Sequence, residues 1–176
     1  SKPIDERYIK DGRIFDANTV TQDVAQLIFA KDRSLFKETL EAAIRTEISI
    51  GRVKLSEVEL QSLLLRRGDA LNEALESAGS KVRIIDENVS KKYEKKGIEY
   101  IQDNIGKEEL IVISTERGAT GIDYQGIIKV SVLDGHNWTH TELVQAMGRD
   151  RSTKGEKAIY FDRDKLIEGR LASKVI

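Results

Sequence analysis

The chain has 176 residues, 39% hydrophobic and 34% charged, which is the size and composition of one soluble domain with a modest core. Its 29 lysines and arginines nearly balance 30 aspartates and glutamates, which excludes an overall basic field, so any polyanion site must be a local patch. No apolar run reaches the ~18 residues of a membrane span, and the absence of cysteine excludes disulfides, thiolate zinc sites and cysteine nucleophiles.

The first half of the chain predicts mainly helices. Residues 1–47 predict a helical N-terminal extension, with one apolar face formed by Val24, Leu27 and Ile28 and another by residues 35–44. A short β-like run follows at 48–50. The pattern from Ser56 to Glu59 is a capping box, which predicts a helix to about Arg67, and a second helix is expected up to Gly79.

The second half predicts strands that alternate with helices. Strands are expected at 82–85, 110–113, 127–133 and 158–161, and helices at 98–105 and, after a capping box at 139–142, through Met147. This alternation favours a three-layer α/β domain with a mainly parallel sheet, which we assign to residues 48–176. Ligands of such sheets bind beyond the carboxyl ends of strands, which directs attention to the polar, glycine-containing stretches 114–126 and 145–155.

Two of these segments carry residues suited to a nucleotide. The segment from Ser114 to Asp123 reads Ser-Thr-Glu-Arg-Gly-Ala-Thr-Gly-Ile-Asp directly after a buried strand, so its glycines allow backbone N–H groups to approach an anion. The segment from Gln145 to Arg151 reads Gln-Ala-Met-Gly-Arg-Asp-Arg at the end of a helix, and arginine binds phosphate through two hydrogen bonds at once.

The order and spacing of these two segments resemble the C-terminal RecA-like domain of superfamily 2 helicases and translocases. Residues 114–123 are similar to motif V of that superfamily, and Gln145-x-x-Gly148-Arg149 is similar to the start of motif VI, which carries the arginine finger. Asp134 stands where the family often has a Tyr-Asp pair, and 155–159 resembles the strand after motif VI.

The resemblance implies half of an ATPase. ATP with Mg²⁺ would be held mainly by an N-terminal RecA-like domain of the same protein. Arg149 and Arg151 would approach the γ-phosphate, and Asp123 would touch the ribose beside Gly121, while Gln145 and Gly148 complete the nucleotide-facing set. Ser114 and Thr115 would contact the RNA or DNA track. No Gly-x-x-x-x-Gly-Lys-Ser/Thr loop occurs, so the chain alone is expected to be inactive.

One departure keeps alternatives open. The family's second arginine normally stands three places after the first, whereas Arg151 follows Arg149 by two. A degenerate RecA-like binding scaffold is therefore retained beside the helicase interpretation. A polypeptide track, as in SecA-type protein translocases, is retained because their motif V is related and because the balanced charge favours it. The only methionine is Met147, so we expect the chain to be a piece of a longer protein. The absence of cysteine fits an intracellular (cytoplasmic) location.

Other conspicuous residues favour ordinary structural roles. Asp86 and Glu87 are expected to form a solvated turn at a strand end rather than a metal site, and His136 and His140 lack a third ligand, so no metal site is expected. We expect Trp138 to anchor its loop on the core rather than stack on a base. The basic run at 91–96 is expected to be a solvated helix face.

Overall fold

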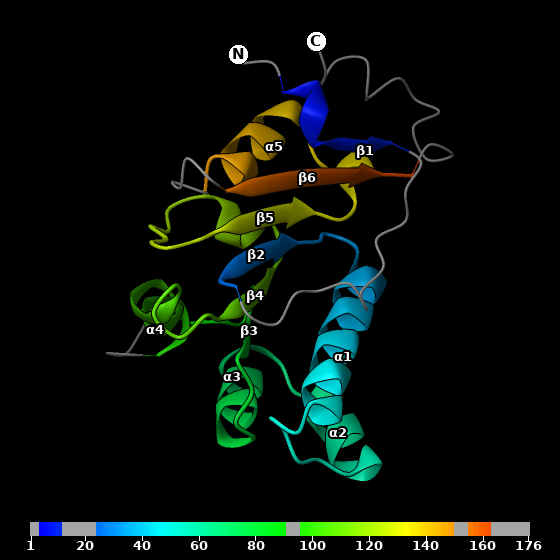
Figure 1. The fold of residues 1–176 in the computed structure, drawn as a ribbon, viewed down its shortest axis with the longest axis vertical. Helices are drawn as coiled ribbons and strands as arrows, with labels where there is room; N and C mark the ends of the chain where they lie inside the picture. The colour runs from blue at the N-terminus through cyan, green and yellow to red at the C-terminus, as the bar shows by residue number, and fades with distance from the viewer. Residues whose placement is uncertain (1–3, 12–23, 91–95, 150–154, 163–176) are drawn as a thin grey trace.

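In a computed structural model, the chain forms one six-stranded, all-parallel sheet with strand order β1-β6-β5-β2-β4-β3 (Figure 1). The structure describes residues 4–11, 24–90, 96–149 and 155–162. The strands are β1 (Ile9–Asp11), β2 (Gln26–Phe29), β3 (Val82–Ile85), β4 (Ile111–Ser114), β5 (Lys129–Val132) and β6 (Glu156–Phe161). The helices are α1 (Arg33–Ser49), α2 (Glu57–Leu64), α3 (Gly68–Ser77), α4 (Gly97–Asn104) and α5 (His140–Met147), with short 3-10 helices η1 (Glu6–Tyr8), η3 (Glu116–Ala119) and η4 (Gly135–Asn137).

Helices cover both faces of the sheet, as the sequence predicts. Crossovers between parallel strands are right-handed, so α1, α2 and α3, which lead from β2 to β3, lie on one face. The connections from β3 back through β4 and β5 to β6 run the other way across the sheet and place α4, η3 and α5 on the opposite face. In the described residues α5 packs on η3 and β5, and α1 packs on β3 and β4.

The strand register places three chain segments at one edge of the sheet. Phe29 at the end of β2 is aligned with Ser114 of β4 and with Val132 of β5, and Ser114 is aligned with Ile85 of β3. The residues that follow these positions therefore leave the sheet side by side, although they are far apart in the sequence.

Two elements predicted near the start of the chain are wrong. The apolar residues near Leu27 form a strand, β2, in the middle of the sheet, and not a helix face. The residues expected as a β-run, 48–50, form the last turn and C-cap of α1, so the expected boundary at residue 47 falls inside a helix. The reason is Glu47, whose buried carboxylate accepts hydrogen bonds from Ser80 Oγ and Lys81 N and fixes this end of α1 against the chain before β3.

The capping boxes are confirmed. Ser56 and Glu59 close the start of α2, and Thr139 and Glu142 close the start of α5, each pair through reciprocal hydrogen bonds between side chain and backbone. In the described residues no helix has the length and apolar character that a membrane crossing needs.

Candidate functional site

An open groove of about 470 Å³ lies at the edge where the strands end. Lys31 and Arg33 enter it from the segment after β2, Thr115 and Arg117 from the segment after β4, and Glu87 from the segment after β3. Phe36 and Glu116 complete its lining. The position matches the rule that ligands of parallel sheets bind beyond the carboxyl ends of strands.

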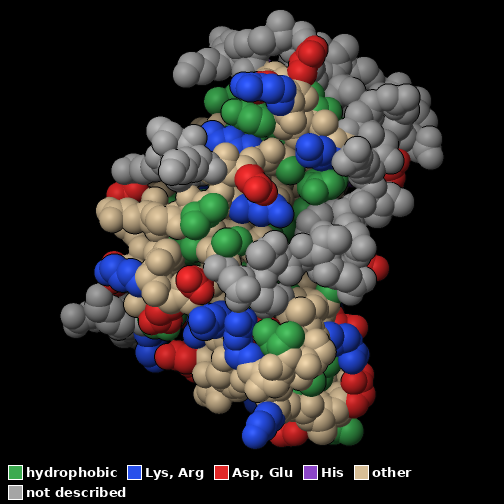
Figure 2. Space-filling view, viewed as in Figure 1, with side chains coloured by type: hydrophobic (Ala, Val, Ile, Leu, Met, Phe, Trp, Pro, Cys, Tyr) green, Lys and Arg blue, Asp and Glu red, His purple; other side chains and the backbone are tan. Residues whose placement is uncertain are grey.

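The groove brings together three cationic side chains, each of which contacts a carboxylate or a carbonyl oxygen of the protein. Lys31 Nζ contacts the Glu142 carboxylate at 2.7 Å, and Arg33 lies 4.0 Å from Asp86 and 3.8 Å from Glu87. Nη1 of Arg117 donates to the carbonyl oxygen of Asp86 at 2.6 Å. On the face shown in Figure 2, basic and acidic side chains are interspersed and form no broad basic field.

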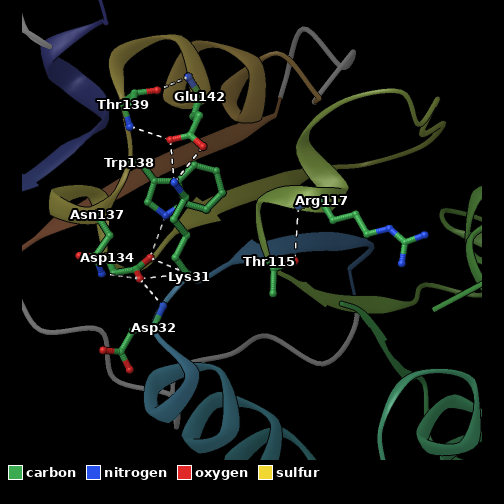
Figure 3. Close-up of polar contacts among 9 residues, drawn as sticks. All are labelled: Lys31, Asp32, Thr115, Arg117, Asp134, Asn137, Trp138, Thr139 and Glu142. Carbon is green, nitrogen blue, oxygen red and sulfur yellow. Dashed lines mark hydrogen bonds and ion pairs between the residues drawn. The ribbon is translucent and has the colours of Figure 1, made fainter. Parts of the chain in front are cut away.

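Asp134 fixes the backbone beside the groove. Its side chain is buried and accepts hydrogen bonds from the backbone N–H groups of Lys31 and Asp32, from Asn137 Nδ2 and from Trp138 Nε1, at 2.7–3.2 Å (Figure 3). These donors come from the β2–α1 and β5–α5 connections. One carboxylate therefore ties two loops together at the edge of the sheet.

Trp138 anchors its loop, as predicted. Its side chain is 1% exposed, and its ring meets the ring of Phe29 edge-on at 5.6 Å. The Lys31 ammonium lies 5.2 Å from the centre of the Trp138 ring, on the way to Glu142 (Figure 3).

The two residues predicted to contact a track differ in access. Ser114 is fully buried and donates to the carbonyl oxygen of Thr115 at 2.6 Å, so its hydroxyl does not face the groove. Thr115 lines the groove, and its Oγ1 accepts from the backbone N–H of Arg117 at the start of η3. Of this pair, only Thr115 is placed to meet a ligand there.

The motif V and motif VI segments meet at Arg149. Its Nη1 donates to the carbonyl oxygen of Ile122 at 2.9 Å, and its Nε donates to the carbonyl oxygen of Gln145 at 3.2 Å. These bonds use two of the five N–H donors of the guanidinium, which is half-buried. The arrangement joins the end of α5 to the residue between Gly121 and Asp123.

The contact between Arg149 and Ile122 does not lie at the edge of the sheet that carries the groove. The sequence predicts residues 145–155 at that edge, beyond the carboxyl ends of the strands. The helix α5 starts beside the groove at Thr139 and runs back along the sheet, so its eight residues carry the chain about 12 Å toward the edge where the strands begin (Figure 1). Arg151 lies outside the described residues, as do Lys91, Lys92 and Lys95 of the basic run.

The remaining predicted nucleotide residues surround Arg149. Gly148 is the exposed C-cap of α5. Gly121 is exposed with φ +72°, a conformation that favours glycine, and a Cβ built there meets no atom within 4 Å, so the space above it is open. Asp123 is half-buried and lines a second cavity, of about 370 Å³, with the end of α4 and residues 125 and 126.

Tyr124 packs in the core and holds the motif V segment through a hydrogen bond. Its hydroxyl is buried and donates to the carbonyl oxygen of Gly118 at 2.8 Å. Burial raises the pKa of Tyr124 above its usual range, and the charge of Arg149 opposes this shift. The tyrosine stays protonated, and it holds the turn as a hydrogen-bond donor.

Asp86 is a buried turn residue, whereas the sequence predicts a solvated one. Its Oδ1 accepts from the backbone N–H of Asn88 at 2.8 Å, and only Glu87 is exposed. Among the residues that the structure describes, no group of three histidine or acidic side chains is arranged to hold a metal ion.

Residues 27–151 match the sequence model of the helicase conserved C-terminal domain family, which is more than two thirds of the chain. The chain belongs to this family. The match spans β2 to the motif VI segment and thus includes β2 and α1, which the sequence interpretation had placed in a separate extension. No curated protein matches the chain.

Comparison with solved structures finds helicases at low similarity. Domain 2 of the DEAD-box helicase Mss116p, bound to an RNA duplex, is 16% identical with a TM-score of 0.44, over 87% of this chain and 61% of that one. Dbp5 of S. cerevisiae, bound to RNA and ADP BeF3, is 16% identical with a TM-score of 0.42, over 90% of this chain and 40% of that one. This helicase-type domain thus spans only part of the length of these proteins.

Sequence reasoning missed the groove residues Lys31, Arg33 and Arg117. A signal for the first two was present, since Lys-Asp-Arg follows the apolar run Leu-Ile-Phe-Ala directly, as functional residues follow a strand. It was hidden because that run was assigned to a helix. Arg117 lay inside the motif V segment, but its role depended on which neighbouring segments the sheet would place beside it.

Proposed function

We propose that the domain is the second motor domain of an ATP-dependent superfamily 2 helicase or translocase and completes an ATP site with its arginines. The observation that carries this proposal is the bond between Arg149 and the Ile122 carbonyl, which joins motif VI to motif V. A guanidinium beside an open glycine surface is suited to an incoming phosphate. Arg149, with Arg151, would stabilise charge on the γ-phosphate during phosphoryl transfer.

The residues present fit one side of a nucleotide. Toward the described residues Arg149 uses two of its five N–H donors, and Asp123 offers a carboxylate suited to a ribose hydroxyl. ATP supplies the phosphoanhydride that is cleaved. Holding Mg²⁺ and the triphosphate falls, in this proposal, to an N-terminal RecA-like domain, which supplies the loop that this sequence lacks.

The groove is proposed to grip a nucleic-acid backbone. Lys31, Arg33 and Arg117 converge there with the hydroxyl of Thr115, and cationic side chains with a hydroxyl donor are the usual partners of phosphodiester oxygens. The nucleotide junction and the groove lie at the two ends of α5, so closure on ATP and the grip on the track would act on one helix.

An intracellular location remains an expectation.

Phosphate release tests the nucleotide half. The chain alone should not turn over ATP, because no loop of its own holds the triphosphate in line, whereas a protein that carries both RecA-like domains should. The readout is magnesium-dependent phosphate release from each purified protein. Robust ATP turnover by the 176-residue chain would contradict the proposal that it supplies only one side of the ATP site.

Salt dependence tests the nucleic-acid half. Each neutralised phosphate of a single strand adds roughly 0.7 to the slope of log affinity against log salt, so three groove cations give a slope of about −2. The probe is a fluorescent single-stranded RNA or DNA oligonucleotide, measured by anisotropy, with an unfolded peptide as the comparison. Capture of the peptide with little salt dependence, and no binding of oligonucleotide, would favour a polypeptide track.

A further inference from the structure

Lys31 stands between the groove and the first turn of α5. Its side chain lines the groove, yet its Nζ lies 2.7 and 2.8 Å from the two carboxylate oxygens of Glu142 (Figure 3). Both partners are only partly buried, with side-chain exposures of 23% and 27%. The ammonium is therefore within reach of solvent and of any anion that enters the groove.

The backbone of Lys31 is held independently of this ion pair. Its N–H group donates to the buried carboxylate of Asp134, and the neighbouring N–H group of Asp32 does the same. The lysine stem is flexible, with four carbons between this fixed backbone and the ammonium. The ammonium can change partner while the loop stays in place.

Glu142 does not need Lys31 to stay in position. Its Oε1 accepts the backbone N–H of Thr139 at 2.8 Å, as the N3 residue of the capping box. A negative charge in the first turn of a helix is also stabilised by the helix dipole. Removing the ammonium leaves the carboxylate bound at the end of α5, so exchange of the lysine between two anions is feasible.

We propose that a phosphodiester in the groove competes with Glu142 for the Lys31 ammonium, so that Glu142 weakens the grip of the groove. This inference rests on the proposed nucleic-acid grip. It assigns to Glu142, a residue that touches no track itself, the role of setting the affinity of the groove.

The test is a comparison of substitutions in the 176-residue chain, with a fluorescent single-stranded oligonucleotide as the probe. Glu142→Gln keeps a capping-box acceptor at N3 but releases the lysine. It should tighten binding by about two- to fivefold, the range that a partly exposed ion pair is worth. Glu57→Gln is the matched control, because it removes the same charge from an ion pair with Arg45, in the first turn of α2.

Lys31→Met separates the competition from a general change of local charge. In that background, Glu142→Gln should have no effect on affinity if the lysine carries the competition. Equal tightening with and without Lys31, equal tightening by Glu57→Gln, or no tightening would each overturn the inference while leaving the grip intact. Failure of the unsubstituted chain to bind at any salt concentration would instead refute the grip, and the inference with it.

The single tryptophan gives a second readout of where the Lys31 ammonium lies. Trp138 is the only tryptophan of the chain, and the Lys31 ammonium lies 5.2 Å from its ring. Its indole N–H, bound to Asp134, gives one resonance in a nitrogen–proton correlation spectrum. Oligonucleotide should shift that resonance in the unsubstituted chain and not in Lys31→Met. An unmoved resonance at saturating oligonucleotide would show that the ammonium stays on Glu142.

Discussion

Nη1 of Arg149 donates to the carbonyl oxygen of Ile122 across 27 residues of sequence, at 2.9 Å. The bond places the arginine of the motif VI segment against the motif V segment, between Gly121 and Asp123. A guanidinium in this position has a structural task within the domain as well as a proposed task toward the γ-phosphate. Substitution of the arginine therefore has to be measured on both stability and turnover.

Arg149→Ala and Arg151→Ala should each lower turnover far more than nucleotide affinity, in a protein that carries both RecA-like domains. An arginine finger acts mainly on transition-state charge, and its loss lowers kcat on the order of 10³-fold or more. Steady-state phosphate release and nucleotide titration give the two quantities. Arg66→Ala, at an exposed position after α2, is the control. Small, equal effects of all three would favour a binding scaffold, and a severe effect of only one would identify the finger.

The elements that sequence predicted best are those whose signals are local. The apolar run at 110–113 and the capping boxes at Ser56 and Thr139 each specify their element through residues within a few positions. The motif V and VI segments were found because their residue types and order are specific. The family match over 27–151 supports that interpretation.

The errors arose where a short segment depends on distant partners. The residues of β2, Gln26–Phe29, form a four-residue strand, and a run of that length has no periodicity that separates strand from helix. What makes it a strand is its place between β4 and β5, which begin about 85 and 103 residues later in the chain. The groove was missed for the same reason, since Lys31 and Arg117 meet only through this pairing.

Asp134→Asn should destabilise the domain by about 2–4 kcal/mol. Both oxygens of the buried carboxylate accept from N–H donors, so an amide must turn its own N–H₂ group toward donors of Lys31, Asp32 or Trp138. Asp32→Asn is the matched control. Asp32 caps α1 through one bond to the N–H of Leu35, and asparagine caps a helix equally well, so a change within about 0.5 kcal/mol is expected. Urea unfolding measures both, and equal effects would contradict the network.

The pKa of Glu142 should rise in Lys31→Met. Burial alone raises the pKa of this carboxyl, but hydrogen bonds from Lys31 and Thr139 outweigh burial and hold it below the usual 4.5. A lowered folded-state pKa means that the stabilisation is present above the unfolded-state pKa and is lost as pH falls through the folded-state value. Lys31→Met should therefore lose less stability on acidification than the unsubstituted chain.

Carboxyl NMR titration measures this shift residue by residue. Glu59 is an internal control, because its pKa is lowered by hydrogen bonds from Ser56 in the other capping box, without a lysine. The substitution should leave the Glu59 pKa unchanged. A Glu142 pKa that also stays unchanged would show that Lys31 does not hold the carboxylate in solution.

Gly106→Ala should destabilise the domain more than Gly51→Ala, although the two glycines have nearly the same φ, +84° and +81°. Both substitutions force a left-handed conformation on alanine, at about 1–2 kcal/mol. A Cβ at Gly51 meets nothing within 4 Å, whereas at Gly106 it would lie 2.7 Å from the Gln125 carbonyl oxygen and 2.9 Å from Gly126 Cα. Because these are backbone atoms, the loop itself must move. We therefore expect Gly106→Ala to lower the free energy of unfolding by about 2–5 kcal/mol in total.

The difference in destabilisation between Gly106→Ala and Gly51→Ala measures the cost of the close approach between the end of α4 and the segment that carries Asp123. Thermal or urea unfolding gives the two stabilities. If the loop moves, the Asp123 side of the 370 Å³ cavity moves with it, so Gly106→Ala should also weaken turnover in a two-domain protein, and Gly51→Ala should not. Equal stabilities for the two variants would show that the loop after Asp123 yields freely, and Gly106 would then have no part in positioning that carboxylate.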